Sequence, residues 1–354
     1  MDQREKALML QRRIALTQRY IGHGGLVGEV FDAYSRIDVL DDWCPVFTSM
    51  AERFERGADA ADDALVKAAN YLKAALYYHI AQLVIHEDND LKKETYSSVV
   101  RAYEKAGPYF WRPVERVEYE FRGVPLWAYF RRATEAERPP CVILVRGVDA
   151  SREAEHHLIS DYFLRKGLST LAIDCPGQYA ARFAGLYMTP DFEKPVGAAI
   201  DCLEKRSDVD IDRLGIIGIS FGGFIAPRAA ALEKRIKACI SLGGFYSLEE
   251  FDYAPTAMIH LLNDTHLTPE EWPQRKQDFS LKGIIEQMTC HLLVVNGSAD
   301  SLQPVAQSIK IYEQAHCPKE LKIYDGFDHC VYSEKKDALS FMADWMAAKL
   351  GGSK

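Results

Sequence analysis

The sequence predicts an α/β fold, with a mostly parallel sheet of eight strands preceded by a domain built only from helices. Three observations lead to this prediction. Residues 1–112 contain no convincing strand, whereas from residue 113 onward short apolar runs alternate with helical stretches. Continuous apolar strands separated by helices are typical of a parallel sheet covered on both faces. One of these runs, residues 214–219, leads through a glycine-rich turn directly into a helical stretch.

The helical domain, residues 1–112, is expected to contain about five helices. Their predicted ranges are 4–20, 27–37, 38–56, a helix that follows Gly57, and 92–105. Asp59 is placed to cap the helix after Gly57, because an aspartate oxygen can accept the unpaired N–H groups of a first turn. Apolar side chains then recur every three or four residues, which predicts one buried stripe: Leu65, Ala69, Leu72, Leu76, Ile80 and Leu83.

Aromatic side chains are denser in this domain than the core of a few helices requires. We expect the surplus to form a wall over an active site and part of a homodimer surface. Tyr77 and Tyr78 are the candidate substrate contacts. Packing of these rings inside the domain is the alternative. The domain is thus predicted to be a cap and dimerisation domain.

The sheet domain, residues 113–354, is predicted to begin with a hairpin. Residues 117–121 and 126–130 alternate apolar and polar side chains on either side of a glycine turn, as hairpin strands do. Six further apolar runs are predicted strands: 141–145, 169–173, 214–219, 238–242, 291–296 and 321–324. Residues 245–283 interrupt the alternation and are predicted to form a lid segment. Residues 333–350 are predicted to form the closing helix.

Composition and charge narrow the class of protein. The hydrophobic fraction of 48% and the charged fraction of 27% are those of globular proteins in water. A net charge of -8 argues against a nucleic-acid partner. The eight cysteines have no C-x-x-C spacing, which favours reduced thiols and a cytoplasmic location. Residues 1–10 lack the apolar core of a signal peptide, and no run is long enough to span a membrane.

Neither a metal site nor a bound cofactor is predicted. Asp208, Asp210 and Asp212 alternate, but the glycine and glutamate of a calcium loop are missing, so we interpret them as a charged turn. The sequence also has no dinucleotide-binding fingerprint and no P-loop.

The pattern Gly218-x-Ser220-x-Gly222 stands between the predicted strand 214–219 and a helical stretch. In this context it predicts a nucleophile elbow, in which a serine hydroxyl is exposed at the tip of a strained turn. Glycines are needed on either side because strand and helix crowd together there. The N–H of Phe221 would point at a developing oxyanion. The alternative is an ordinary serine in a glycine-rich turn.

A serine nucleophile needs a base, and the base needs a carboxylate that orients it. Asp300 follows the predicted strand 291–296, and His329 follows the strand 321–324. Hydrolases with a parallel sheet place their triad in the chain order Ser, Asp, His, on loops at the carboxyl ends of strands. We therefore predict a catalytic triad of Ser220, Asp300 and His329.

The sequence also allows other roles for these residues. Asp300 could only cap the helix that begins near Pro304. Asp328 could compete as the partner of His329, although adjacent side chains rarely face each other. His79 and His86 are interpreted as ordinary groups of the helical domain.

A second oxyanion donor is expected from the loop after the strand 141–145. This loop reads Arg146-Gly147-Val148-Asp149-Ala150, and the N–H of Val148 is the candidate donor. Arg146 could bind an anionic or carbonyl-rich substrate, or could face solvent.

Taken together, several stretches resemble those of α/β-hydrolases with an N-terminal helical domain. That family includes 2,6-dihydropseudooxynicotine hydrolase, fungal polyketide-shortening hydrolases and FrsA-like esterases. The resemblance covers most of the chain. It rests on NYLKAALYY at 70–78, DCPGQ at 174–178, GISFGG at 218–223, SLGGF at 241–245, NGSAD at 296–300 and GFDHC at 326–330.

The resemblance implies the α/β-hydrolase fold and the same triad. It also implies one of two reactions, since some members cleave a carbon–carbon bond next to a ketone and others cleave esters. The resemblance further implies that the members that cleave carbon–carbon bonds use an extra acidic residue after the Gly-Gly-Phe stretch. In this chain the candidates for that residue are Glu249, Glu250 and Asp252. Relatives often carry Gly-Gly-x-Asp after the third strand, and the arginine at 146 departs from that pattern.

The expected function is that of a serine hydrolase acting on a hydrophobic, carbonyl-rich small molecule. C–C hydrolysis of a β-diketone, a polyketide-like compound or an aromatic ketone is the first expectation. A carboxylesterase, thioesterase, acyltransferase or cyclase with the same triad is the alternative. A non-catalytic binding protein on a hydrolase scaffold is the alternative from another class, and the presence of all three triad residues argues against it.

Overall fold

The computed structural model describes residue 13 and residues 16–253 and 255–352. The chain forms two compact units. The helical unit comprises Met1–Val114 together with Glu153–Leu158, and the sheet unit comprises Glu115–Arg152 together with Ile159–Lys354. The change from helices to strands therefore falls near the predicted position, but the assignment of residues 153–158 to the helical unit was not expected.

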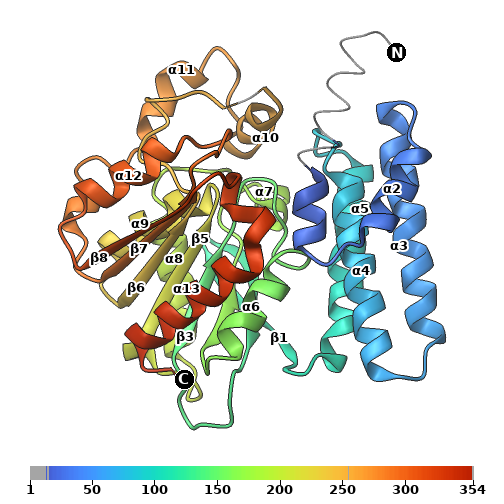
Figure 1. Cartoon of the computed structure of the whole chain (residues 1–354), viewed down its shortest axis with the longest axis horizontal. Coiled ribbons are helices and arrows are strands. Elements are labelled where there is room, and N and C mark those ends of the chain that lie inside the picture. Colours follow the sequence, from blue (N-terminus) through green and yellow to red (C-terminus); the bar gives the residue numbers. More distant parts are fainter. Residues whose placement is uncertain (1–12, 14–15, 254, 353–354) are drawn as a thin grey trace. The chain divides into compact units, whose positions relative to one another are not determined.

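Three helices lie side by side in the helical unit, with α4 packed against both α3 and α5 (Figure 1). Residues 13 and 16–22 are also helical, whereas the rest of the helix predicted over residues 4–20 lies outside the described residues. The bounds of the helices are α2 Val27–Ser35, α3 Trp43–Ala60, α4 Ala64–Gln82 and α5 Asp90–Ala106.

The predicted start of the fourth helix was wrong. Gly57 and Asp59 lie inside α3, and the residue that caps α4 is Asp63. Its Oδ1 accepts the N–H groups of Leu65 at 2.8 Å and Val66 at 3.0 Å. A glycine inside a helix costs only about 1 kcal/mol, so α3 can continue through Gly57 as far as Ala60. The next helix, α4, then begins at the capping residue Asp63.

The predicted buried stripe on α4 was wrong in its first half. Leu65 is 73% exposed and Ala69 is exposed, whereas Ala68 and Tyr71 are buried. From Ala74 to Leu83 every side chain is buried. A middle helix with neighbours on two sides is covered nearly all round, so its C-terminal half has no single apolar stripe.

The aromatic side chains of the helical unit pack mainly against one another inside it. This is the alternative to a wall over the active site that the sequence left open. Trp43 donates its Nε1–H to the carbonyl of Ile80 at 3.0 Å, and Phe47 stacks on Tyr77 with ring centroids 6.2 Å apart. The hydroxyl of Tyr77 donates to Glu29 at 2.5 Å. That of Tyr78 donates to Glu55 at 3.0 Å, so both tyrosines are committed to partners within this unit.

The segment Glu153–Leu158 is held in the helical unit by a buried carboxylate. Glu155 is within 3.2 Å of Arg19 Nε, 3.0 Å of His23 Nε2 and 2.8 Å of His79 Nε2. Burial alone would raise the pKa of Glu155, but the positive charges of Arg19 and His23 outweigh it and hold that pKa well below its usual value. His79 is accordingly part of a structural ion-pair cluster.

The sheet unit contains one eight-stranded sheet in the order β1-β2-β4-β3-β5-β6-β7-β8. Strand β2 pairs antiparallel with β4, and from β4 to β8 every neighbouring pair is parallel. The strands are β1 Val114–Phe121, β2 Val124–Arg131, β3 Cys141–Val145, β4 Ser169–Ala172, β5 Leu214–Ile219, β6 Ile236–Leu242, β7 His291–Gly297 and β8 Lys319–Tyr324. The mostly parallel sheet predicted from the apolar runs is confirmed.

Helices cover both faces of the sheet (Figure 1). Along β3, Ile143 and Val145 face a core shared with α8, α9 and α12, whereas Val142 and Leu144 face a core shared with α6 and α13. The helices of this unit are α6 His156–Leu164, α7 Tyr179–Phe183, α8 Glu193–Glu204, α9 Gly222–Leu232, α10 Pro255–Thr265, α11 Trp272–Arg275, α12 Val305–Gln314 and α13 Lys335–Leu350.

Strand β8 departs from the expectation of strands buried on both faces. It lies at the edge of the sheet, and its residues 320–322 are exposed. An edge strand has a neighbour on one side only, so its side chains are less covered than those of central strands.

The segment predicted as a lid, residues 245–283, contains the short helices α10 and α11, which lie together beyond one end of the sheet (Figure 1). Its first residue is anchored firmly. Phe245 is fully buried and stacks on Phe224 of α9 with ring centroids 4.7 Å apart. The lid role stays a prediction.

Candidate active site

Ser220 sits at a strained turn between β5 and α9. Its φ of 60° is in the left-handed region, which a residue with a side chain rarely adopts. The N–H of Ser220 donates to the carbonyl of Leu242 at 2.9 Å and fixes the turn against β6. A Cβ at Gly218 would stand 1.8 Å from the carbonyl oxygen of Gly222, and a Cβ at Gly222 would stand 2.5 Å from that of Val145. Only glycine fits at these two positions.

The structure brings Ser220, His329 and Asp300 into one hydrogen-bonded chain. His329 Nε2 lies 2.9 Å from Ser220 Oγ, and His329 Nδ1 lies 2.7 Å from Asp300 Oδ2. Asp300 follows β7 and His329 follows β8, so two loops at the carboxyl ends of neighbouring strands meet the elbow. The Asp300 side chain has no exposed surface and that of His329 is 14% exposed.

Asp300 both orients the imidazole and caps the following turn. While Oδ2 faces His329, Oδ1 accepts the N–H groups of Leu302 at 2.9 Å and Gln303 at 2.8 Å. The two roles that the sequence allows for this residue are therefore compatible. Three N–H donors around one buried carboxylate fix its orientation.

Asp328 is turned away from its neighbour. Its Oδ1 accepts the hydroxyl of Ser333 at 2.8 Å and the N–H of Ser333 at 3.3 Å. The alternative in which Asp328 pairs with His329 is therefore wrong.

Cys330 is a neighbour of the imidazole that no sequence pattern indicated. Its Sγ lies 3.3 Å from His329 Nε2, the nitrogen that also faces Ser220. The backbone of Cys330 is in the left-handed region, with a φ of 54°, which turns the thiol back toward the ring. A Cβ on Gly243 would approach this sulfur to 2.8 Å, so a glycine is required beside it.

Burial and charge act in opposite directions on His329. Burial lowers the pKa of its imidazole. The interactions with Cys330 and Asp300 raise that pKa by more than burial lowers it, so the pKa lies well above the usual value of 6.5.

Two main-chain N–H groups were predicted to stabilise negative charge at the elbow, and this role stays a prediction. Phe221 follows the serine directly, and Val148 belongs to the loop after β3. A Cβ on Gly147 would lie 3.3 Å from Ser220 Oγ, so this loop passes next to the hydroxyl. Within the part of the chain that the structure describes, no acceptor occupies either N–H.

A strand–elbow–helix serine, with its acid and base on the last two strand loops, is the arrangement that α/β-hydrolases share. The family model described as "Esterase FrsA-like" matches residues 2–250. The chain belongs to the FrsA-like esterase family. A prolyl oligopeptidase family model also matches residues 184–353.

Relatives of this FrsA-like hydrolase include a 2,6-dihydropseudooxynicotine hydrolase from Paenarthrobacter nicotinovorans. It is 27% identical over 322 residues, which cover 86% of this chain and 83% of the relative. Hydrolase ORFZ from Pyricularia oryzae is 30% identical over 253 residues, covering 64% of this chain and 59% of the relative. The chain thus spans less than two thirds of the length of this fungal relative.

Solved structures agree with this membership. A crystal structure of the 2,6-dihydroxy-pseudo-oxynicotine hydrolase superposes with a TM-score of 0.86 at 26% identity, covering 94% of this chain and 95% of the other. The protein AbyA5 superposes with a TM-score of 0.77 at 17% identity, covering 92% and 91%, and shows a shared fold.

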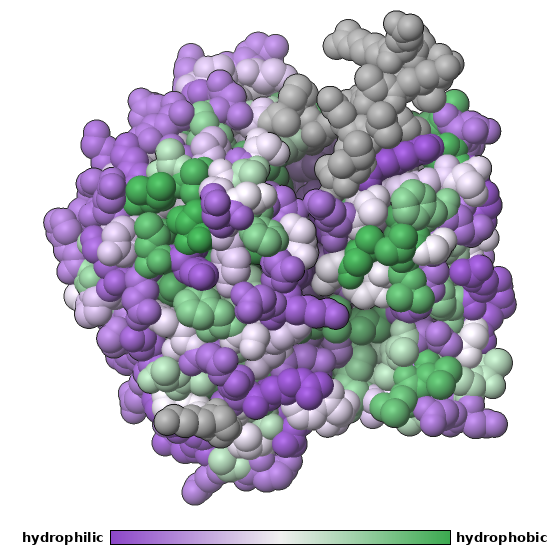
Figure 2. Space-filling model, in the orientation of Figure 1, coloured by the Kyte–Doolittle hydropathy of each residue, from purple (hydrophilic) through white to green (hydrophobic). Residues whose placement is uncertain are grey.

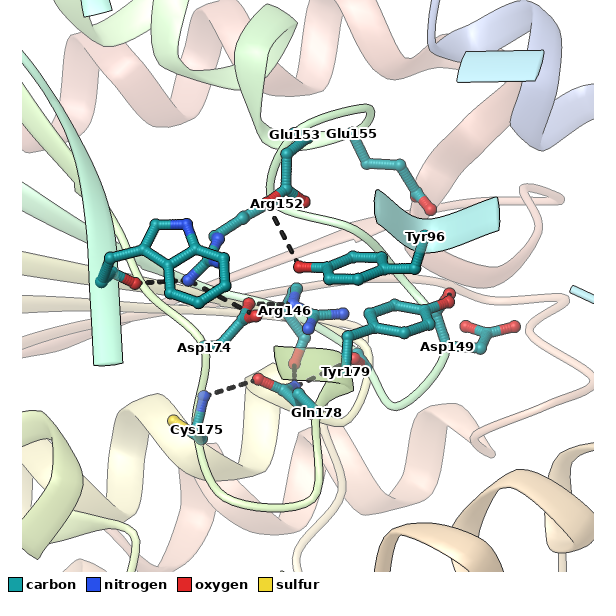
Figure 3. Close-up of polar contacts among 12 residues, drawn as sticks. Tyr96, Arg146, Asp149, Arg152, Glu153, Glu155, Asp174, Cys175, Gln178 and Tyr179 are labelled. Atoms are coloured by element: carbon teal, nitrogen blue, oxygen red, sulfur yellow. Dashed lines mark hydrogen bonds and ion pairs between the residues drawn. The ribbon is translucent and has the colours of Figure 1, made fainter. Parts of the chain in front are cut away.

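In this FrsA-like hydrolase Arg146 does not face solvent. Its side chain is fully buried, its Nε donates to Asp174 Oδ1 at 2.7 Å, and its guanidinium lies 4.8 Å above the ring of Tyr179 (Figure 3). The alternative in which Arg146 only faces solvent is therefore wrong. Its commitment to Asp174 and Tyr179 supports a structural role and gives no support to substrate binding.

The three candidates for an extra acid lie at exposed positions. Glu250 accepts from Gln307 and from Lys310, and Asp252 pairs with Lys276 at 2.9 Å. Glu249 is exposed next to them. Among the described contacts, none joins these carboxylates to Ser220, Asp300 or His329. The structure therefore gives no support to an assisting role for them.

Aromatic rings from residues 245–283 pack against Phe221, the residue that follows the serine. Phe245 contacts Phe221 with ring centroids 5.3 Å apart and Tyr253 with centroids 6.4 Å apart. The hydroxyl of Tyr253 accepts from Gln303 Nε2 at 2.6 Å, and the N–H of Gln303 is one of the donors to Asp300. Tyr253 is thereby linked to the acid, and no sequence pattern indicated it.

Neither a metal cluster nor a membrane span occurs within the described residues. No group of three or more His, Cys, Asp or Glu side chains there could hold a metal ion. Among the helices of the same residues, none has the length and apolar character that crossing a membrane requires.

Proposed function

We propose that this α/β-hydrolase uses Ser220 as nucleophile, His329 as general base and Asp300 as the group that orients the base. The observation that supports this most directly is the unbroken chain of 2.9 Å and 2.7 Å contacts that ends at a strained serine. The Phe221 and Val148 N–H groups would stabilise the oxyanion.

The substrate that we propose is a hydrophobic, carbonyl-rich small molecule. Tyr253 is a partly exposed aromatic residue that is joined through Gln303 to Asp300, and its ring favours an apolar or aromatic ligand. The similarity to a hydrolase of 2,6-dihydropseudooxynicotine supports the same class of ligand.

In the proposed reaction, Ser220 Oγ attacks a ketone carbonyl while its proton passes to His329 Nε2. The tetrahedral adduct then collapses with cleavage of the bond between the carbonyl carbon and its neighbouring carbon. The electron pair stays on the neighbouring carbon, which leaves as a carbanion that an adjacent carbonyl or aromatic ring delocalises. His329 then gives its proton to this leaving group. Water, deprotonated by His329, hydrolyses the acyl-serine and releases a carboxylic acid.

Ester hydrolysis with the same residues is the second candidate function, because the matching family model describes esterases. An ester needs no delocalising group next to the carbonyl, since an alkoxide leaves without one. A thioester, or transfer of the acyl group to a nucleophile other than water, would proceed through the same acyl-serine.

Two measurements test the proposal. Mass spectrometry after treatment with a fluorophosphonate should find the adduct on Ser220, and Ser220→Ala should abolish both labelling and turnover. A panel of p-nitrophenyl esters compared with 1-phenyl-1,3-butanedione would separate the two reactions. Faster turnover of the diketone supports C–C hydrolysis, and turnover of the esters alone refutes it.

We also propose that the chain forms a homodimer through its helical unit. Figure 2 shows hydrophobic patches on this unit, on the right of the view. Exposed large apolar side chains of residues 21–40 support this: Ile21, Leu26, Val27, Phe31, Val39 and Leu40. Light scattering should give twice the 40.0 kDa chain mass, and Phe31→Glu should reduce it to that of one chain. A monomer in the unmodified protein refutes the proposal.

A further inference from the structure

The loop after β3, residues 146–149, carries the proposed oxyanion donor Val148 but contains no regular secondary structure. A donor stabilises a transition state only if its N–H already points at the place where charge develops. Something outside the loop must therefore hold the Gly147–Val148 peptide in position. The contacts of the loop after β4, residues 174–179, provide this support.

Gln178 joins the two loops through all of its polar atoms. Its Nε2 donates to the carbonyl oxygens of Arg146 and Gly147, each at 3.1 Å (Figure 3). Its Oε1 accepts the N–H of Cys175 at 2.8 Å. The side chain is fully buried, and partners of opposite kind fix which end of the amide faces which loop.

The carbonyl of Gly147 and the N–H of Val148 belong to the same peptide group. In a trans peptide these two groups point in opposite directions within one plane. Gln178 on the carbonyl side thus directs the Val148 N–H away from itself. Gly147 also lies against Ser220, since a Cβ at position 147 would come within 3.3 Å of the serine Oγ. A hydrogen bond to the carbonyl additionally polarises the peptide and strengthens its N–H as a donor.

Gln178 is itself rigidly placed. The N–H of Gly177 donates to the carbonyl of Leu186 at 2.7 Å, and a Cβ on Gly177 would come within 2.6 Å of Met188 Cβ. With a φ of 88°, Gly177 adopts a backbone conformation that favours glycine. On the other side, the hydroxyl of Tyr179 donates to the carbonyl of Asp149 at 2.8 Å and fixes the far end of the loop.

We propose that Gln178 is a positioning residue that aligns and polarises the Val148 N–H for the oxyanion. This inference rests on the proposed function, because it assumes that Ser220 is the nucleophile. It assigns Gln178 no contact with the substrate. Its effect should therefore fall on the transition state and leave binding of the ground state unchanged.

The test compares Gln178→Met with Ser169→Ala. Gln178→Met preserves length and removes all three hydrogen bonds. Ser169 is a buried residue at the other end of β4, where its Oγ accepts the N–H of Ala133 at 3.1 Å, so Ser169→Ala removes a buried main-chain contact far from the elbow. Gln178→Asn, which keeps a polar amide one methylene shorter, is used if the methionine variant does not fold.

Two rates are measured on the full chain. The second-order rate of labelling by a fluorophosphonate should fall about 10- to 100-fold in Gln178→Met, since losing a whole oxyanion donor costs about 10²- to 10³-fold. With p-nitrophenyl butyrate, kcat should fall by a similar factor and KM should stay within about twofold. Ser169→Ala should leave labelling and kcat at the unmodified level.

The outcomes separate the two proposals. If Ser220→Ala abolishes labelling but folded Gln178→Met or Gln178→Asn labels as fast as Ser169→Ala, the positioning role is refuted and the nucleophile stands. If KM rises while kcat is unchanged, Gln178 acts on binding and the inference is also overturned. If Ser220→Ala still turns over substrate, the proposed function fails whatever Gln178 does.

Discussion

Asp300→Asn tests the geometry of the site most sharply. The asparagine Oδ1 can still accept the N–H groups of Leu302 and Gln303, which Asp300 Oδ1 accepts at 2.9 Å and 2.8 Å. The amide NH₂ would then face His329 Nδ1, where the carboxylate oxygen now lies at 2.7 Å. A donor opposite Nδ1 forces the imidazole to carry its proton on Nε2, so the ring can no longer accept the proton of Ser220.

The size of the effect follows from this change of tautomer. We expect kcat to fall about 10⁴-fold, which corresponds to about 5.4 kcal/mol of transition-state stabilisation. The free energy of unfolding should fall by only about 1–2 kcal/mol, because two charge-assisted hydrogen bonds become neutral ones without being lost. Asp300→Ala should be less stable than Asp300→Asn, since it also leaves two buried N–H groups without their acceptor.

The assay is turnover of p-nitrophenyl butyrate, together with thermal unfolding of each variant. Asp328→Asn is the matched control, because the carboxylate of this neighbouring aspartate accepts hydrogen bonds from Ser333. It should retain kcat within a few-fold. The reasoning is refuted if Asp300→Asn keeps kcat within about tenfold of the unmodified enzyme, and more so if Asp328→Asn loses it.

Three further outcomes are expected. Gly218→Ala should lower both the unfolding free energy, by about 1–3 kcal/mol, and the labelling of Ser220, because its Cβ would meet a carbonyl oxygen 1.8 Å away; unchanged melting and labelling would contradict this. The pH–rate profile should rise through a limb above pH 6.5, since His329 must be neutral to act as base and its pKa is raised; a limb at or below 6.5 would contradict this. Deleting residues 1–112 should give a poorly soluble protein, because Glu155 loses Arg19 and its other partners; a soluble monomer with unchanged substrate preference would show that the helical unit is dispensable.

The three residues of the proposed triad could be predicted from the sequence, because such hydrolases carry them in a fixed order along the chain. Ser220 stands in a motif that only a strand-to-helix turn accommodates, and Asp300 and His329 each follow an apolar run. Because parallel strands end at the same edge of a sheet, their loops had to be close together. Local pattern and topology therefore sufficed for these three, and the structure brings them into contact.

Contacts between side chains and distant backbone could not be predicted in this way. Gln178 lies in the DCPGQ stretch, yet nothing in its neighbours shows that its amide reaches the carbonyls of Arg146 and Gly147. Arg146 shows the same limit, because the sequence suggested a substrate contact for this arginine. Its partner is Asp174, which lies 28 residues further along the chain. Helix boundaries failed for a related reason, since Gly57 is a weak signal that packing overrides.

The two rims of the sheet also bear on how the protein behaves at high concentration. An open strand edge is a template on which another chain can add a strand and start aggregation. Strand β1 carries Glu115, Arg116, Glu118 and Glu120 at exposed positions, and β8 carries Glu320 and Lys322. An incoming strand would have to desolvate these charges at either rim. The charges on β1 and β8 therefore disfavour the addition of a strand from another molecule at either edge of the sheet.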